Sequence, residues 1–268
     1  MAGSPRRQHI ATLEFRAPHL HRGASSDMQL VLDFPVTESY NFSNFVVCSG
    51  NETAFRFAER ISGTGGEENL LYLHGPAGSG KTHLLEACAA TIGGRINNSP
   101  LPTFSFKETP GMSPQSIGAI LQRRFHDTPG LFIDDIQLAP SDQSLKGQIW
   151  QLFNDFHGLG KPVVITGQQP PKELGNLDGH LSSRLLWGLV ARVDISDDES
   201  RLMIMQKLAA DRQVILPVDV TEFLLRHLPR DIPTLIGTLD RIVRYALATG
   251  RKVTTRLAAE VLSKGTQE

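Results

Sequence analysis

The segment from Leu70 to Ala87, LLYLHGPAGSGKTHLLEA, constrains the fold of this chain more than any other part of the sequence. It reads as a short apolar strand, a glycine-rich loop and an amphipathic helix that starts near Lys81 and is expected to stop at Gly93-Gly94. The loop from Gly75 to Thr82 matches the pattern Gly-x4-Gly-Lys-Thr. In such a loop the backbone N–H groups surround a polyphosphate, so side chains must be absent where the backbone closes round it. The segment therefore predicts a strand–loop–helix unit that binds a nucleoside triphosphate or diphosphate.

Each part of this phosphate-binding loop (P-loop) has an expected role. Lys81 is expected to reach the outer phosphates, the Thr82 hydroxyl to bind Mg²⁺, and the helix to add the positive end of its dipole. An ordinary glycine-rich turn is the competing interpretation, which the complete pattern in its strand–loop–helix context disfavours. The predicted nucleotide-binding residues are Gly75, Pro76, Ala77, Gly78, Ser79, Gly80, Lys81, Thr82 and His83.

A second candidate site lies in the segment Gly130 to Asp135, GLFIDD. Its apolar residues predict a buried strand that ends in two adjacent carboxylates. Such carboxylates are costly at the end of a core strand unless they meet a cation. Acids at a strand end can also form a simple turn, but a P-loop upstream favours the metal interpretation. We expect Asp134 to hold Mg²⁺ through water and Asp135 to polarise an attacking water.

Two further candidates follow along the chain. The apolar strand 163–166 ends at Thr166, and Gln168 comes shortly after it, so either side chain could contact a γ-phosphate or the attacking water. A solvent-facing turn is an equally good interpretation there. Arg184 follows two serines and precedes an apolar run. Most arginines are solvated surface residues, but this one could be an arginine finger that stabilises phosphoryl-transfer charge in cis or on a neighbouring subunit.

The bulk composition excludes several classes of function. With 27 basic and 28 acidic side chains, the chain has no global charge to drive non-specific nucleic-acid binding. Two cysteines do not make a disulfide framework and suit a reducing compartment. No apolar run approaches the length of a membrane span. We therefore expect a cytoplasmic protein that has no membrane partner, and direct binding to DNA would need a local basic patch.

The regions before and after the predicted α/β core differ from it in composition. Residues 1–27 are rich in Arg, His, Ser and Pro, which predicts a disordered extension. Residues 28–39 contain QLVLDF, in which apolar side chains alternate as in an edge strand or in a peptide that docks in an extended form. From Ser196 onward the pattern is helical. A capping-box pattern, Ser196 to Glu199, predicts the start of a helix that reaches about residue 211, and further helices are predicted over 218–227, 233–248 and 255–263.

These elements in this order resemble an AAA+ ATPase module, and within that class the bacterial DnaA initiator family. The resemblance is carried by NFSNFVV (41–47), the P-loop segment (71–87), FIDDIQ (132–137) and SSRLLWGLV (182–190). It implies an α/β core of five parallel strands over 40–195, followed by a small all-helical lid over 196–268. It also implies that the ligand is ATP or ADP together with Mg²⁺, and that the protein could form homo-oligomers.

Two features separate this chain from a full initiator. It ends after the lid, so we expect no C-terminal helix-turn-helix domain, and it carries QLVLDF ahead of the module. That combination is similar to the Hda type of DnaA paralogue, which switches initiators off. The hexapeptide resembles the motif by which replication proteins bind the sliding clamp. The resemblance assigns clamp binding to Gln29, Leu30, Leu32 and Phe34.

The resemblance implies a mechanism in which this chain acts on a partner. Its partners would be the sliding clamp and a DnaA-type initiator, and Arg184 would act in trans on the ATP of the initiator. The family has a nucleotide-sensing arginine in the third lid helix, but Pro233 occupies that place here. Arg230, one helical turn earlier, is the candidate substitute. Hydrolysis by the chain's own site is therefore expected to be weak.

Two other functions remain open from the sequence. An autonomous AAA+ ATPase that acts as a helicase loader or motor would turn over ATP without an initiator, and QLVLDF would be only a linker. A DNA-binding initiator fragment is the third possibility, which the neutral charge disfavours.

Overall fold

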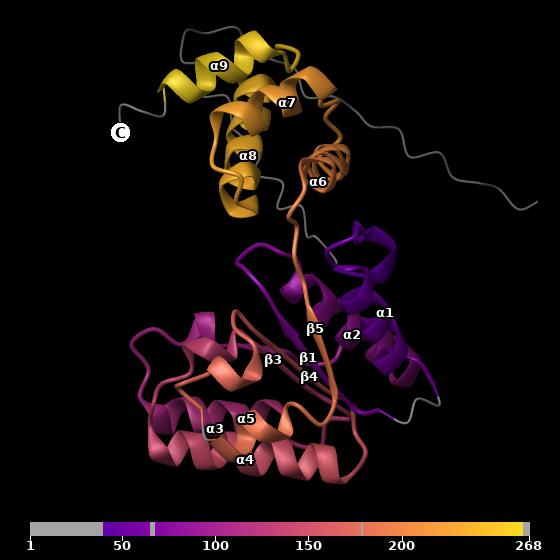
Figure 1. Cartoon of the computed structure of the whole chain (residues 1–268), viewed down its shortest axis with the longest axis vertical. Coiled ribbons are helices and arrows are strands. Elements are labelled where there is room, and N and C mark those ends of the chain that lie inside the picture. Colours follow the sequence, from indigo (N-terminus) through magenta and orange to yellow (C-terminus); the bar gives the residue numbers. More distant parts are fainter. Residues whose placement is uncertain (1–39, 65–67, 178, 265–268) are drawn as a thin grey trace, which may run out of the picture. The chain divides into compact units, whose positions relative to one another are not determined.

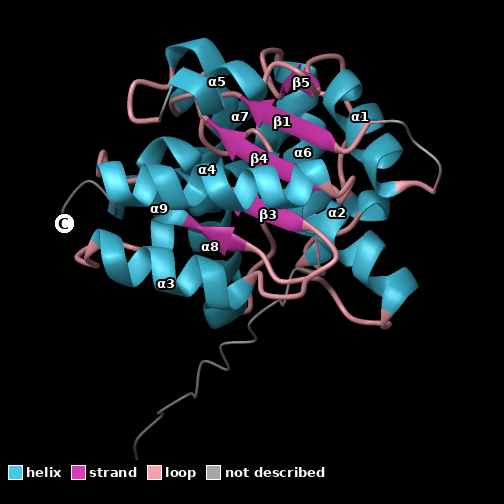
Figure 2. Cartoon of the chain, turned by 90° about the horizontal axis from the view of Figure 1, so that it is seen from below, coloured by secondary structure: helices cyan, strands magenta, loops and turns pink. Residues whose placement is uncertain are grey.

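A parallel β-sheet lies at the centre of the structure. The computed structural model describes residues 40–64, 68–177 and 179–264. In that part of the chain the sheet has five strands in the order β2-β3-β4-β1-β5. The strands are β1 (Leu70–His74), β2 (Phe104–Ser105), β3 (Leu131–Asp134), β4 (Val163–Gly167) and β5 (Leu189–Arg192). Figure 2 shows the arrows of β1, β4 and β3 side by side and pointing the same way. The predicted five-stranded parallel sheet is confirmed.

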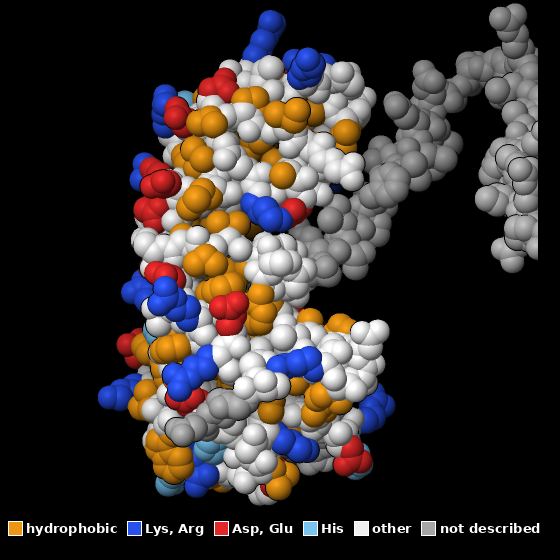
Figure 3. Space-filling model, turned by 90° about the vertical axis from the view of Figure 1, so that its right-hand side faces the viewer, with side chains coloured by type: hydrophobic (Ala, Val, Ile, Leu, Met, Phe, Trp, Pro, Cys, Tyr) orange, Lys and Arg blue, Asp and Glu red, His pale blue; other side chains and the backbone are white. Residues whose placement is uncertain are grey.

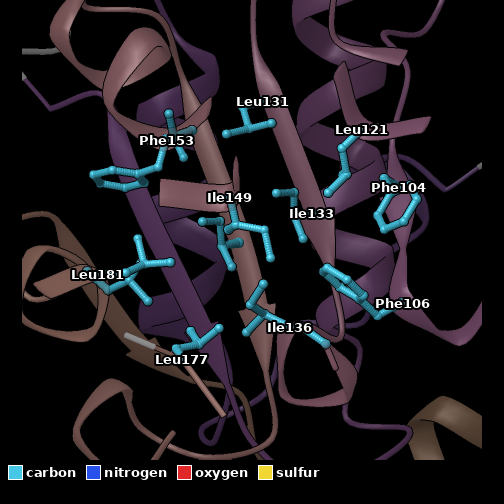
Figure 4. Close-up of a cluster of buried hydrophobic side chains, with 14 of the residues drawn as sticks. Phe104, Phe106, Leu121, Leu131, Ile133, Ile136, Ile149, Phe153, Leu177 and Leu181 are labelled. Carbon is cyan, nitrogen blue, oxygen red and sulfur yellow. The ribbon is translucent and has the colours of Figure 1, made fainter. Parts of the chain in front are cut away.

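Both faces of this sheet are buried, which explains why its inner strands are apolar without alternation. Leu70 and Tyr72 of β1 face one hydrophobic cluster, whereas Leu71 and Leu73 face another. In Figure 1, α1 (Glu52–Ser62) and α2 (Lys81–Ile96) lie on one side of the sheet. On the other side lie α3 (Pro114–Arg124), α4 (Gln143–Gly158) and α5 (Gly179–Arg184). Figure 4 shows side chains of the cluster that contains Leu70 and Tyr72, which point toward one another between strands and helices.

The helix after the P-loop differs from the sequence-based expectation at its end. Gly93-Gly94 was expected to stop it, but α2 continues to Ile96. A Cβ atom at Gly93 would lie only 2.1 Å from the carbonyl oxygen of Ser99, where the chain returns against the helix. This glycine therefore permits a close backbone approach and does not mark a break.

The lid consists of helices α6 (Asp198–Asp211), α7 (Val218–His227), α8 (Ile232–Thr249) and α9 (Thr255–Lys264). They share a hydrophobic core of their own, built from residues such as Leu224, Leu239 and Leu257. The expected capping box at Ser196 is wrong. The carboxylate of Asp197 instead accepts from both the backbone N–H and the hydroxyl of Ser200, each at 2.7 Å, so α6 starts one residue later. The predicted helical lid is confirmed.

The described residues all fall within one compact unit, Val36–Glu268. None of the helices among them is long and apolar enough to span a membrane. The expected extension, 1–27, and the segment QLVLDF, 29–34, lie outside the described residues.

Candidate functional site

The candidate site lies where the carboxyl ends of β1, β3 and β4 meet. The P-loop follows β1 and leads into α2, and the N–H of Gly75 donates to the carbonyl oxygen of Gly167 at the end of β4, at 3.3 Å. Because parallel strands end at one edge of a sheet, this topology also brings Asp134 of β3 and Thr166 of β4 to the P-loop. Residues from three separate segments of the sequence thus meet in one place.

Lys81 is buried at the start of α2, with 5% of its surface exposed. Its ammonium donates to the carbonyl oxygens of Gly75, at 2.9 Å, and of Pro76, at 2.7 Å. Burial lowers the pKa of Lys81, and the carboxylates of Asp135 and Asp134 oppose this shift. An ammonium bonded to loop carbonyls can exchange them for phosphate oxygens, which bear a full charge and form stronger hydrogen bonds.

Asp134 connects the P-loop helix to β4 through a chain of hydrogen bonds. The Thr82 hydroxyl donates to Oδ2 of Asp134 at 2.9 Å, and the Thr166 hydroxyl donates to Oδ1 at 2.5 Å. The N–H of Asp135 in turn donates to Thr166 Oγ1 at 3.1 Å. Burial raises the pKa of Asp134 despite the hydrogen bonds from Thr166 and Thr82. The hydroxyl of Thr166 therefore contacts both residues that the sequence singled out.

The oxygens of Thr82 and Asp134 are suitable ligands for Mg²⁺, but these two residues alone do not form a complete metal site. Mg²⁺ binds hard oxygen ligands, commonly one or two carboxylates together with waters and substrate phosphates. In the described part of the chain, no group of three or more His, Cys, Asp or Glu residues could hold a metal ion. Thr82 and Asp134 would hold a magnesium ion whose other ligands are phosphate oxygens and water.

Asp135 has a counter-ion that the sequence did not indicate. The ammonium of Lys107, which follows β2, lies 2.7 Å from Oδ2 of Asp135. The Gln137 amide donates to Oδ1 at 2.9 Å. Burial favours a raised pKa for Asp135, but the hydrogen bonds from Lys107 and Gln137 outweigh it and hold the pKa below its ordinary value. Asp135 is therefore an ionised carboxylate kept in place at the edge of the site.

Replacing Lys107 by Met should destabilise the fold, because it leaves the buried Asp135 carboxylate without its counter-ion. The Asp135 side chain is 4% exposed and that of Lys107 is 62% exposed, so solvent screens the pair from one side. We expect a loss of about 1 kcal/mol in the free energy of unfolding. Urea denaturation measures it. Lys172→Met, at an exposed lysine, is the control, and a Lys107→Met protein as stable as the original would contradict the prediction.

The P-loop forms one wall of a cavity of about 360 Å³. Core residues before and after the P-loop and lid residues from α6 and α8 complete it. Its core walls include Phe45, Val46, Asn51, Lys107, Asp135, Gln168 and Ile195, and its lid walls include Ile204, Lys207, Leu208, Asp211, Ile232 and Ile236. The lid side is mainly apolar, whereas the P-loop side is polar. The cavity can therefore hold a molecule with a flat apolar end and an anionic end.

The segment before α1 covers part of this cavity. Nε2 of His83 lies 2.9 Å from the carbonyl oxygen of Asn41, and the ring of Phe45 packs edge-on against the His83 ring at 5.1 Å. The Asn51 amide donates to the carbonyl oxygen of Val46 at 3.0 Å. His83 therefore positions the segment beside the P-loop. No periodic pattern in the sequence indicated this contact.

The lid contacts the P-loop through a proline. A Cβ atom at Gly78 would lie 2.5 Å from Cδ of Pro233 in the first turn of α8, so only glycine fits there. Arg230 lies elsewhere: its guanidinium pairs with Asp198 at 3.3 Å, and it is not part of the described cavity lining. Gln168 lines the cavity, and its N–H donates to Gln137 at 3.1 Å. The sensor roles of Thr166, Gln168 and Arg230 remain predictions.

Arg184 ends α5 and does not belong to the described cavity lining. Its guanidinium donates to Oδ1 of Asn154 on α4 at 2.5 Å. The guanidinium carbon also lies 4.6 Å from the ring centre of Trp150 and 4.9 Å from that of Trp187. Arg184 therefore lies outside the described lining of its own cavity, and its predicted catalytic role stays a prediction.

Two family models match the chain. Residues 36–192 match the family described as Bacterial DnaA ATPase domain, and residues 198–262 match the family described as Hda, lid domain. The DnaA protein of Anaplasma marginale is 30% identical over 240 residues, which cover 87% of this chain and 51% of that protein. The DnaA protein of Gloeothece citriformis is 33% identical over 232 residues, covering 84% of this chain and 51% of that protein. The chain thus spans about half the length of these relatives.

Solved structures show the same fold. Domain III of Thermotoga maritima DnaA matches with a TM-score of 0.74 and 25% identity, covering 87% of this chain and all of that one (100%). AMPPCP-bound DnaA from Aquifex aeolicus matches with a TM-score of 0.64 at 21% identity, covering 78% of this chain and 66% of that one. The DnaA core match spans more than half of the sequence and the lid match follows it directly. The chain therefore belongs to the DnaA family of AAA+ ATPases and carries a lid of the Hda type.

Proposed function

We propose that this protein is a negative regulator of replication initiation. It binds an adenine nucleotide and the sliding clamp, and it stimulates ATP hydrolysis by a DnaA-type initiator, which becomes inactive and cannot initiate again. The observation that carries the proposal is the joining of a DnaA-type ATPase core to an Hda-type lid in one chain. The position of Arg184, outside the cavity of its own chain, supports action on a partner.

Nucleotide binding rests on the polarity of the cavity. Its P-loop side offers the Lys81 ammonium and the N-terminal end of α2 to the phosphates of ATP or ADP. Its apolar walls, such as Val46, Ile204 and Ile236, suit the faces of an adenine ring. A magnesium ion held by Thr82 and Asp134 would neutralise phosphate charge.

Hydrolysis at this chain's own site is proposed to be weak. Pro233 packs against Gly78 where the family's lid arginine is expected, so it offers no guanidinium to the phosphates. The Asp135 carboxylate is engaged by Lys107. Nucleotide in this cavity would instead join the lid to the core, since both line it. The bound nucleotide would then stabilise the conformation that meets a partner.

The chemistry on the partner needs a single group from this chain. A guanidinium that enters a neighbouring active site neutralises charge on the transferring phosphoryl group, and such a finger accelerates hydrolysis by about 10³- to 10⁵-fold. The initiator would supply the P-loop, the metal ligands and the attacking water. Arg184 would complete that site, and the products would be phosphate and an ADP-bound initiator.

DNA is proposed to take part only through the clamp. Figure 3 shows basic and acidic side chains interspersed over the visible face, with no single basic patch over it. The chain's formal net charge is −1. A clamp loaded on DNA would bring the protein to replicated DNA without a phosphate-binding surface of its own.

The experiment that tests the proposal is reconstitution. The initiator encoded by the same genome is loaded with radiolabelled ATP and mixed with this protein and a clamp loaded on DNA. We expect conversion to the ADP-bound form only when all components are present. ATP turnover by this protein alone, with no effect on the initiator, would overturn the proposal and favour an autonomous ATPase.

Clamp binding should depend on the hexapeptide at residues 29–34. Replacing Gln29 and Leu32 together by Ala removes a polar contact and an apolar anchor of an extended peptide, so we expect the clamp affinity to fall by about 100-fold. A pull-down with the purified clamp measures the loss. Glu38→Ala, just outside the hexapeptide, serves as the control, and equal capture of the double variant would rule out this docking segment.

A further inference from the structure

We infer that Trp150, Trp187 and Asn154 form an arginine-positioning cluster, which orients the Arg184 guanidinium toward the ATP of a partner. In this inference Trp187 is a positioning residue for the hydrolysis of that ATP. The inference rests on the proposed function of Arg184. It goes beyond it, because it assigns a role to three residues that form no part of the nucleotide cavity described above.

The arginine-positioning cluster rests on helices that are packed in the hydrophobic core. Trp150 lies on α4, partly buried, and its ring stacks on that of the fully buried Phe153 with centroids 6.4 Å apart. Leu181 and Leu185, exposed by 1% and 0%, anchor α5 and the following turn in the same hydrophobic cluster. Arg184 therefore projects from a backbone that is held by packing on both sides.

The turn after α5 brings the second tryptophan to the arginine. The N–H of Trp187 donates to the carbonyl oxygen of Arg184 at 2.9 Å, so the two residues are three apart in a helix-like turn. At that spacing side chains share a face. The indole of Trp187 thereby comes to 4.9 Å from the guanidinium carbon, close to the 4.6 Å of Trp150. Both distances lie within the range of cation–π attraction.

The guanidinium keeps most of its hydrogen-bonding capacity despite these contacts. Its described hydrogen bond, to Asn154, uses one of five N–H donors. The aromatic rings contact the guanidinium without taking any donor. A long flexible side chain is thus confined while its remaining donors stay available for phosphate oxygens. Confinement in advance lowers the entropy cost of reaching the transition state.

Trp187 is also exposed to an unusual degree for its type. It is 67% exposed, and its neighbour Leu186 is 40% exposed. A large aromatic side chain that is not needed for the hydrophobic core, yet contacts the one arginine with a proposed role in trans, fits a functional constraint better than a packing one. Lys in place of Arg184 would lack the planar group that the arginine-positioning cluster contacts.

The test uses the reconstituted reaction with full-length protein. We expect Trp187→Ala to lower the maximal rate of initiator ATP hydrolysis by about tenfold or more, with little change in the concentration of this protein that gives half the maximal rate. Trp187→Phe, which keeps an aromatic face, should retain most of the activity. Leu159→Ala, at a leucine that is 71% exposed and lies beyond α4, is the control and should behave as the original protein does.

The tryptophans themselves supply a second readout. The chain contains two of them, and both lie beside Arg184. In the Trp187→Phe protein, Trp150 is the one remaining tryptophan, so replacing Arg184 by Met should change the tryptophan fluorescence of the free protein. Unchanged emission would show that the guanidinium does not lie on the Trp150 ring, and would overturn the proposed arginine-positioning cluster.

The remaining outcomes separate this inference from the proposed function. Full stimulation by Trp187→Ala, while Arg184→Ala is inactive, would overturn the arginine-positioning cluster and leave the arginine-finger role intact. A raised half-maximal concentration at an unchanged maximal rate would make Trp187 a docking residue, which also overturns the positioning role. Full stimulation by Arg184→Ala would refute the arginine-finger role of Arg184 and its positioning cluster together, whereas no stimulation by the original protein would refute the proposed function itself.

Discussion

Replacing Arg184 by Ala is expected to abolish stimulation of the initiator's ATP hydrolysis, with a loss of about 10³-fold in the stimulated rate. The physical reason is that the charge of the phosphoryl group in the transition state would lose its guanidinium partner. Nucleotide binding by the variant itself should be unchanged, because Arg184 is not part of the described lining of its own cavity. Conversion of ATP to ADP on the initiator is the quantity to measure.

Two variants control this experiment. Arg226→Ala removes an exposed arginine of the lid that pairs with Glu222, so it tests whether loss of any surface arginine has the same effect. Arg184→Lys keeps the charge but loses the planar fork, and it should recover only a small part of the stimulation. Retained stimulation by Arg184→Ala would refute the assignment of the arginine finger to Arg184.

Replacing Lys81 by Met should weaken the binding of ATP and ADP by about 100-fold, because charge-assisted hydrogen bonds to the outer phosphates are lost. Met keeps the apolar stem that packs in the P-loop, and it removes a buried charge whose described hydrogen bonds are to two carbonyl oxygens. The fold should therefore persist. Titration with a fluorescent adenine nucleotide measures the affinity.

The same titration carries its own checks. Lys172→Met, at an exposed lysine that is not part of the described cavity lining, should bind nucleotide as the original protein does. Stimulation of the initiator by Lys81→Met should fall together with nucleotide occupancy if the nucleotide shapes the surface that presents Arg184. Undiminished affinity in Lys81→Met would disprove the assigned phosphate site.

Local patterns were sufficient to predict most of the fold. An apolar run of four residues that ends in a glycine-rich loop predicts a buried strand followed by a turn, and helical spacing over 218–227 predicts the bounds of α7 as observed. Helix ends were harder. The stop at Gly93 and the cap at Ser196 were wrong because an apposed backbone and a neighbouring carboxylate decided them. The backbone that approaches Gly93 cannot be read from a local pattern, whereas Asp197 is the neighbour of Ser196 and is an equally good N-cap residue.

The residues of the candidate site also differ in whether a local sequence pattern could identify them. The P-loop and the pair Asp134 and Asp135 were recognisable because each consists of consecutive residues whose chemistry is unusual in its local context. Lys107 was not, because a lysine after a two-residue strand looks like any surface lysine until the sheet places it 2.7 Å from Asp135. Its role depends on β2 lying next to β3, and strand order is a property of the tertiary structure.

The sequence by itself determined that this chain is a nucleotide-binding α/β module with a helical lid, because hydrophobic periodicity and the P-loop are encoded in neighbouring residues. It also singled out Arg184 as a candidate. Only the tertiary structure decided that Arg184 contacts the rings of both Trp150 and Trp187, and that Pro233 packs against Gly78. Contacts between residues far apart in the sequence depend on how separate elements pack, and no local pattern records that packing.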